Sequence, residues 1–195
     1  AVTAADLGGA LAEPPSWDEH IGSLIDIYRR AEHEHVESDP FLRFTAAWLD
    51  ANRPAPLPLR LVHGDFQAAN IMTEPETGRH LLIDWELAHI GDPREDLGYY
   101  NIYSSASGPN LFAADPEGFL ARYREATGFS IEAVNMATMG YFSALASITV
   151  FSRILAGAGA MALGANSGIM TTYTINALTV GHSNWMANCV GGKVA

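Results

Sequence analysis

The sequence predicts an α+β chain that is mainly α-helical and carries one small β-rich insert. Apolar residues recur at helical spacing before residue 50 and again beyond Asp96. Between these regions, short apolar runs at 59–61, 71–72 and 81–83 are typical of small strands, and a Glu-Thr-Gly turn at 76–78 separates the last two. The 195 residues are 48% apolar and 17% charged, which fits a folded globular protein. We therefore expect one domain over 1–195.

Two helices should precede the insert. Ser16 followed by Glu19 is the signature of a capped helix start, and apolar residues at 21, 24, 25 and 28 continue at helical spacing. Asp39-Pro40 opens a second helix, which Asn52-Arg53-Pro54 should end. The Pro-rich segment 54–58 then reads as a rigid extended connector.

Helices are also expected after the insert. Pro116 suits the first turn of a helix that Gly128 ends. Two long apolar segments follow, at about 131–156 and 166–188, and the Gly/Ala-rich stretch from Gly157 to Gly164 should form a turn between them. Beyond residue 132 the only charged residues are Arg153 and Lys193. Polar residues scattered through 133–152 favour packed helices over a membrane span there.

Composition excludes several classes of protein. A net charge of −11 argues against a nucleic-acid partner, which would require clustered Lys and Arg. The single cysteine, Cys189, excludes an intramolecular disulfide and a Cys-based zinc cluster. The first 15 residues lack the pattern of a signal peptide, so a cytoplasmic location is the default expectation.

The chemistry lies in the insert. A strand leads into His63-Gly64-Asp65, Asn70 follows five residues after Asp65, and Asp84 ends another strand 14 residues later. Phosphoryl transfer needs a group that orients the attacking hydroxyl and oxygen ligands that hold Mg²⁺ against the phosphates. Asp65, Asn70 and Asp84 supply that set in the order and spacing of a kinase catalytic loop and its metal-binding aspartate.

Two stretches resemble the aminoglycoside phosphotransferase and choline kinase superfamily: LVHGDFQAANIM at 61–72 and LLIDWELAHIGDPREDLGYY at 81–100. Within it, Asp-Trp-Glu at 84–86 together with Gly91-Asp92-Pro93 and Asp96-Leu97 resembles the branch associated with acyl-CoA dehydrogenases. The resemblance implies the C-terminal lobe of the protein-kinase-like fold, in which a small β-hairpin region carries the catalytic and metal loops.

The resemblance also implies ATP and Mg²⁺ as cofactors and assigns roles to four acidic or amide residues. Asp65 would accept or orient the proton of the substrate hydroxyl. Asn70 and Asp84 would bind Mg²⁺ and, through it, ATP. Glu86 would be either a further group at the metal or a substrate contact.

Three other residues match supporting positions. His63 would fix the catalytic loop by hydrogen bonding, and Asp96 would brace its backbone. Gln67 stands where many protein kinases place Lys or Arg to steady the transferring phosphate. Because Gln67 offers only a neutral hydrogen bond, it disfavours a protein kinase.

The N-terminal ATP-binding lobe of such a kinase is expected to be absent. That lobe supplies a Gly-rich loop over the phosphates and a strand lysine. The lone lysine, Lys193, follows the catalytic loop, and Gly157–Gly164 lacks both a preceding strand and a Gly-Lys-Ser/Thr ending.

The predicted function is an ATP-dependent phosphotransferase lobe that transfers the γ-phosphate to a hydroxyl of a small molecule and is inactive without its N-terminal lobe. Aminoglycoside-like, choline-like and hydroxyacyl alcohols are the candidate substrates. The alternative is a truncated or degenerate lobe that binds a ligand or partner without turnover. The expected protein partner is a second copy of the chain or the missing N-terminal lobe.

Overall fold

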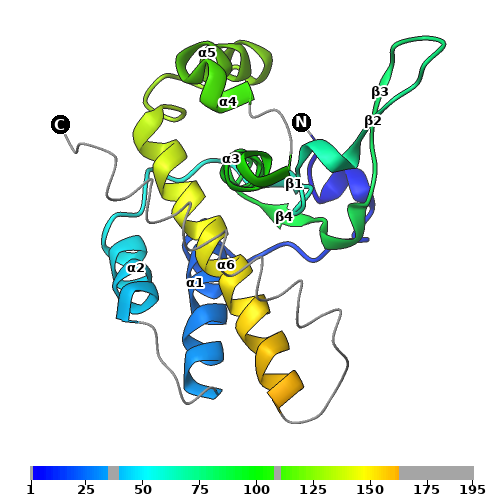
Figure 1. Cartoon of the computed structure of the whole chain (residues 1–195). Coiled ribbons are helices and arrows are strands. Elements are labelled where there is room, and N and C mark those ends of the chain that lie inside the picture. Colours follow the sequence, from blue (N-terminus) through cyan, green and yellow to red (C-terminus); the bar gives the residue numbers. More distant parts are fainter. Residues whose placement is uncertain (1, 35–39, 108–110, 163–195) are drawn as a thin grey trace. The chain divides into compact units, whose positions relative to one another are not determined.

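The computed structural model describes residues 2–34, 40–107 and 111–162 (Figure 1). Contacts within the chain divide it into two compact units, Ala1–Ile21 with Arg53–Ser143 and Gly22–Asn52 with Ala144–Ala195. The mainly α-helical α+β class is confirmed, because helices dominate and the strands of the described residues form only two antiparallel pairs. The apolar segment expected at 166–188 lies outside the described residues, and the single domain over 1–195 stays a prediction.

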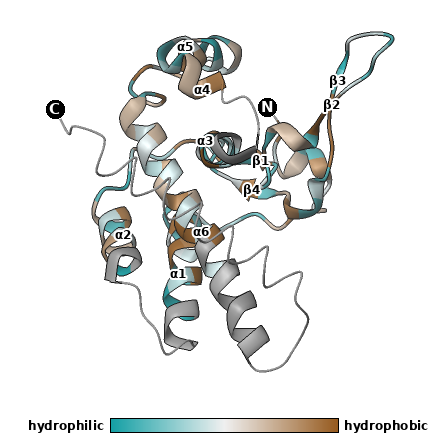
Figure 2. Cartoon of the chain, in the orientation of Figure 1, coloured by the Kyte–Doolittle hydropathy of each residue, from teal (hydrophilic) through white to brown (hydrophobic). Residues whose placement is uncertain are grey.

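The first unit holds both strand pairs. β1 (Arg60–Val62) pairs with β4 (His89–Gly91), and β2 (Ile71–Thr73) pairs with β3 (His80–Leu82). The three predicted strands are confirmed as β1, β2 and β3, whereas β4 was not predicted. Figure 1 shows the β2–β3 hairpin projecting from the β1–β4 pair, and Figure 2 shows that its strands are largely hydrophobic while its turn is hydrophilic.

The predicted start of α1 (Trp17–Glu34) is confirmed by its cap. Ser16 Oγ accepts a hydrogen bond of 3.1 Å from the Glu19 N–H, which satisfies a backbone donor that the first turn leaves free. α2 (Pro40–Ala51) ends directly before Asn52, as expected. Arg29 of α1 forms ion pairs with Asp26 and with Asp50 of α2, all within the second unit.

Three helices follow the strands: α3 (Glu95–Ser107), α4 (Leu111–Ala114) and α5 (Pro116–Thr127). The predicted bounds of α5 are confirmed. Asp115 caps its start by accepting the Gly118 N–H at 3.0 Å, and Gly128 ends it in the left-handed conformation at φ 75°. A buried apolar cluster packs among these helices and the residues that follow them. Its members are Leu97, Tyr100, Phe112, Leu120, Val134 and Met139.

The turn expected at Gly157–Gly164 is wrong for the residues that the structure describes. α6 runs from Met136 to Ala162 without a break, so Gly157 and Gly159 are helical. A glycine inside a helix costs only about 1 kcal/mol relative to alanine, and the neighbouring Leu, Ala and Met residues are strong helix formers. None of the described helices is both long and apolar enough to cross a membrane.

Candidate active site

The predicted catalytic loop begins where β1 ends, and a carboxylate holds its backbone there. Asp96 of α3 accepts hydrogen bonds from the backbone N–H of His63 at 2.9 Å and of Gly64 at 3.0 Å. Gly64 has φ 79°, a left-handed conformation that favours glycine, and a Cβ at this position would overlap the Leu87 carbonyl oxygen. Only glycine therefore fits this bend of the loop without strain.

His63 joins the loop to the segment that carries Asp84. The imidazole is 1% exposed, and its Nε2 donates to the Ile83 carbonyl oxygen at 2.9 Å. Its Nδ1 accepts from the Asp65 N–H at 3.2 Å. The carbonyl can only accept and the amide can only donate, so these two contacts require the tautomer protonated on Nε2.

Asp65, Gln67 and Asn70 lie together at the turn of the loop. Gln67 Nε2 donates to Asp65 Oδ1 at 3.0 Å, and Asn70 Nδ2 donates to Asp65 Oδ2 at 2.8 Å and to the Asp65 carbonyl at 2.9 Å. Both oxygens of the carboxylate are thus oriented by neutral donors. An ionised carboxylate has about four acceptor positions, so Asp65 retains capacity for further donors.

Asn70 also presents an oxygen that nothing else uses. The residue is 8% exposed, and among the described residues no group donates to its Oδ1. A buried polar atom without a partner normally has a bound ligand, ion or water. The amide oxygen of Asn70 is therefore suited to bind a hard cation such as Mg²⁺.

Asp84 is placed next to Asn70 by the backbone. The Ile83 N–H donates to the Asn70 carbonyl at 3.0 Å, and Asp84 follows directly. Asp84 is exposed and has φ 66°, the sole positive φ of a non-glycine residue in the described part of the chain. Its carboxylate has no hydrogen-bond partner there, and the same holds for exposed Glu86 two residues later. A left-handed aspartate stores of order 1 kcal/mol of strain, which is characteristic of functional positions.

Tyr99 is a site residue that the sequence motifs do not predict. Its hydroxyl hydrogen-bonds the Asp65 carboxylate, and its ring stacks on Tyr103 with centroids 4.4 Å apart. Burial, the neighbouring Tyr103 and the bond to Asp65 all raise the pKa of Tyr99, so it remains a neutral donor. Tyr99 lies three residues after Asp96 on α3, and this helical spacing is the signal that could have found it.

Burial raises the pKa of Asp96, and the two N–H groups of the loop oppose that shift in part. The loop is also anchored in the core: Phe66, between Asp65 and Gln67, packs on the apolar cluster with its ring 5.7 Å from that of Tyr100. The Asp65 carboxylate is therefore flanked by a partly buried aromatic side chain.

The segment Gly91-Asp92-Pro93 gives the loop and strands further support. Asp92 is fully buried and accepts hydrogen bonds from the guanidinium of Arg94 and from the indole N–H of Trp17 at 2.6 Å. Arg94 Nη1 and Nη2 donate further to the carbonyl oxygens of Ala133 and Ala55. This buried ion pair thus connects segments that precede β1 in the sequence with a segment that follows β4.

Comparison with known proteins agrees with this geometry. The profile of a family described as "Phosphotransferase enzyme family" matches residues 4–134. Acyl-CoA dehydrogenase family member 10 of Mus musculus is 38% identical over 73 residues, which are 37% of this chain and 6% of that protein. Acyl-CoA dehydrogenase family member 11 of Homo sapiens is 33% identical over 78 residues, 39% of this chain and 10% of that protein. The chain therefore spans a small part of these curated relatives.

Two solved structures share the fold. A "putative aminoglycoside phosphotransferase" from Ralstonia eutropha JMP134 superposes with a TM-score of 0.72 at 20% identity, covering 94% of this chain and 59% of that one. A choline kinase from Streptococcus pneumoniae superposes with a TM-score of 0.53 at 19% identity, covering 84% and 55%. The predicted kinase-like C-terminal-lobe fold is thereby confirmed.

Proposed function

Because the chain belongs to the phosphotransferase enzyme family, we propose that it is the C-terminal lobe of a kinase that transfers the γ-phosphate of ATP to a small-molecule hydroxyl. One observation carries the proposal. Asn70 directs its amide nitrogen to Asp65 and leaves its oxygen without a partner among the described residues, so one side chain serves both the base and a cation.

Asp65 is the residue placed to handle the proton. As the substrate oxygen bonds to the γ-phosphorus, the bond from that phosphorus to the β–γ bridging oxygen breaks and ADP leaves with the electron pair. The hydroxyl proton passes to Asp65, whose carboxylate is held by Gln67, Asn70 and Tyr99. Such a positioned base contributes about 10²–10⁴-fold in rate.

The metal ligands would be Asn70 Oδ1 and the carboxylate of Asp84, with Glu86 near them. When bound, Mg²⁺ would neutralise the negative charge that develops on the phosphates during transfer. In the described part of the chain, Asp65, Asp84 and Glu86 do not form a ready three-ligand cluster. This fits a Mg²⁺ that arrives with the nucleotide, since proteins usually hold this ion by one or two groups plus phosphates.

The β2–β3 hairpin indicates where the rest of the kinase would sit. Met72 and Leu81 are cross-strand partners on one face of the hairpin and are 53% and 40% exposed. Trp85, close to the metal-binding aspartate, is 43% exposed. Exposed apolar side chains such as the paired Met72 and Leu81 are typical of an interface. We assign this face to the adenine ring and to an N-terminal lobe, which accounts for the expected inactivity of the chain alone.

The acceptor is best sought among hydroxyacyl compounds first, then among choline-like and aminoglycoside-like alcohols. Hydroxyacyl compounds come first because part of this chain is similar to proteins named acyl-CoA dehydrogenase family members. Neutral Gln67 beside Asp65 suits a small alcohol better than a protein substrate.

The test measures Mg-ATP binding and phosphate transfer with and without an N-terminal lobe from a kinase of this family, supplied as a fusion. Asp65→Asn should lower turnover about 10²–10⁴-fold, and Asp84→Asn should weaken Mg²⁺ binding, so that turnover requires a higher Mg²⁺ concentration. Glu76→Gln, in the exposed hairpin turn, is the matched control and should change neither. If the fusion binds no nucleotide, the lobe is non-catalytic and the alternative of a degenerate binding lobe stands. If Asp65→Asn retains full turnover, Asp65 is not the base and the proposed mechanism is wrong.

A further inference from the structure

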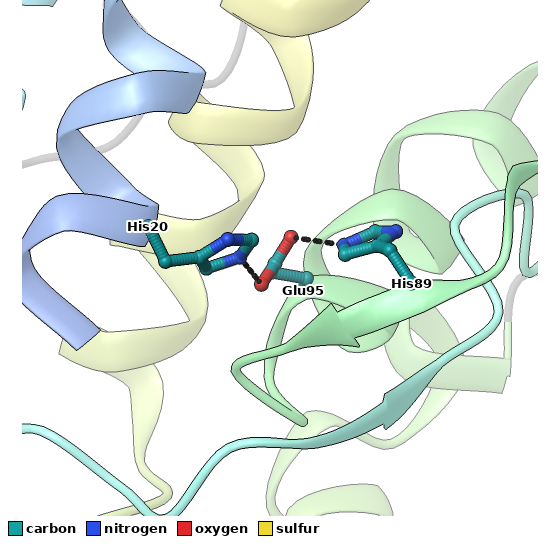
Figure 3. Close-up of side chains that lie close together, drawn as sticks. All are labelled: His20, His89 and Glu95. Atoms are coloured by element: carbon teal, nitrogen blue, oxygen red, sulfur yellow. Dashed lines mark hydrogen bonds and ion pairs between the residues drawn. The ribbon is translucent and has the colours of Figure 1, made fainter. Parts of the chain in front are cut away.

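Two histidines and a glutamate meet in the first unit (Figure 3). His20 lies in the first turns of α1, His89 begins β4 and Glu95 begins α3. Glu95 Oε1 is 2.6 Å from His20 Nε2, and Glu95 Oε2 is 3.1 Å from His89 Nε2. One atom from each residue lies within 4.8 Å of the other two. Three elements thus direct metal-binding atoms to one point.

The ring of His89 is oriented as metal-binding rings usually are. Its Nδ1 lies 2.9 Å from the Leu87 carbonyl oxygen, which can only accept, so Nδ1 carries a proton. In a neutral imidazole the lone pair is then on Nε2, which faces Glu95. A lone pair facing a carboxylate requires a cation between them, either a second proton or a metal ion. Support of the far ring nitrogen by a backbone carbonyl is common among histidines that bind metals.

Glu95 is fixed from another direction as well. The Asp92 backbone N–H donates to its Oε1 at 2.7 Å. Burial by itself raises the pKa of Glu95, but the hydrogen bonds and charges of His20 and His89 outweigh burial and lower it to about 2. The carboxylate is therefore ionised, as a metal ligand must be.

Gly91 leaves room for this cluster. A Cβ on Gly91 would lie 2.5 Å from Glu95 Oε1, 2.7 Å from His20 Nε2 and 3.0 Å from His89 Cδ2. The site is also accessible from one side, because the side chains of His20 and Glu95 are 7% and 12% exposed whereas that of His89 is 34% exposed. A side chain at position 91 would therefore collide with the cluster, and solvent reaches the cluster at His89.

We propose that His20, His89 and Glu95 bind one Zn²⁺ ion through two imidazole nitrogens and a carboxylate oxygen, with a fourth position open to water. This ligand set is one that proteins use for zinc, at bond lengths of about 2.0–2.2 Å. The ion replaces the proton that each histidine now shares with Glu95. It stabilises the frame of the catalytic loop, because His89 pairs with Val62 directly before the loop and Glu95 precedes Asp96.

The site differs from the proposed Mg²⁺ site in its chemistry. Imidazole nitrogen suits zinc and other first-row transition metals, whereas Mg²⁺ prefers oxygen ligands. The zinc site therefore needs no nucleotide, and excess Mg²⁺ should not displace the ion.

The test uses the full chain, stripped of metal with a chelator and dialysed against Zn²⁺ without nucleotide. Metal content should reach one zinc per chain, and thermal unfolding should shift to higher temperature. His89→Gln and Glu95→Gln should each lower the affinity by more than the 10–100-fold typical of losing a supporting contact. Gly91→Ala keeps all three ligands but fills the space between them, so it should weaken binding too.

His80→Gln is the matched control, since His80 is an exposed histidine on the hairpin bonded to Thr73. It should leave the affinity unchanged. If the wild-type chain holds no zinc at equimolar concentration, or if His89→Gln and Glu95→Gln bind as the wild type does, the proposal is wrong and the cluster is a hydrogen-bonded ion pair alone.

Spectroscopy on the unaltered chain covers the case in which the variants fail to fold. Co²⁺ bound in place of Zn²⁺ should give the intense visible absorption of a four-coordinate site with nitrogen and oxygen ligands. That absorption should disappear on acidification, because protons compete with the metal for the imidazole nitrogens. A weak six-coordinate spectrum would overturn the proposal.

Discussion

Arg94 and Asp92 form a two-pronged ion pair in which Arg94 Nε lies 2.9 Å from Asp92 Oδ1 and Nη2 lies 2.7 Å from Oδ2. Their side chains are only 2% and 0% exposed. The guanidinium also lies 4.7 Å from the centre of the Phe142 ring. Desolvating two charges is costly, and here the cost is offset by hydrogen bonds that satisfy the remaining donors.

Replacing Arg94 with Leu should therefore destabilise the chain by about 3–5 kcal/mol, because it leaves a buried carboxylate without its partner. Urea unfolding measures this loss. Arg79→Leu is the control: its pair with Glu74 is at the surface, with Arg79 65% exposed, and should contribute at most about 1 kcal/mol. The double variant Asp92→Leu/Arg94→Leu should recover part of the stability. A cost below about 1 kcal/mol for Arg94→Leu would mean that the pair adds nothing to the fold.

Gly64→Ala should be more damaging than the same change at Gly78. Both glycines have positive φ, 79° and 70°, so alanine costs about 1–2 kcal/mol at either position. At Gly64 the new methyl group also overlaps the Leu87 carbonyl, whereas at Gly78 it meets nothing within 4 Å. We expect a further 1–3 kcal/mol at Gly64, measured by thermal or urea unfolding. Equal losses at the two sites would show that the loop bend is not tightly packed.

The part of the site that is local in sequence could be predicted from it. The spacing from Asp65 to Asn70 is set by one loop, and the structure does bring these two residues into hydrogen-bond contact. The structure likewise places Asp96 on the loop backbone. The capped start of α1 and the Gly128 end of α5 were also predictable, since each depends on residues within one helical turn.

Long-range pairings could not be predicted in this way. His20 and Glu95 are 75 residues apart, so their contact depends on the tertiary fold and not on local sequence. β4 has three residues and no alternating pattern, and its pairing with β1 depends on the loop between them. The Gly157–Gly164 turn was wrongly predicted because glycine content was weighed without the helix-forming residues around it.

Tyr99→Phe tests whether the hydroxyl positions the proposed base. Loss of a hydrogen bond to a charged group costs about 1.5–3 kcal/mol, so kcat in the two-lobe protein should fall about 10–100-fold. KM for ATP should not change, because Tyr99 touches Asp65 and not the metal ligands. Tyr123→Phe is the control, since that hydroxyl donates to the Pro93 carbonyl instead. If the two variants have the same kcat, Tyr99 supports the fold alone.

Met72→Gln and Leu81→Gln test the assignment of the hairpin face. Both side chains are largely exposed, so the stability of the chain alone should change by less than about 0.5 kcal/mol in urea unfolding. If an N-terminal lobe and adenine cover this face, each variant should weaken their binding at least about 5-fold, or ~1 kcal/mol. Ile131→Gln alters an equally apolar side chain, 59% exposed, outside the hairpin. It should leave both stability and binding unchanged, because only buried apolar area contributes to affinity. Equal effects of all three variants on binding would show that the hairpin is not the docking face.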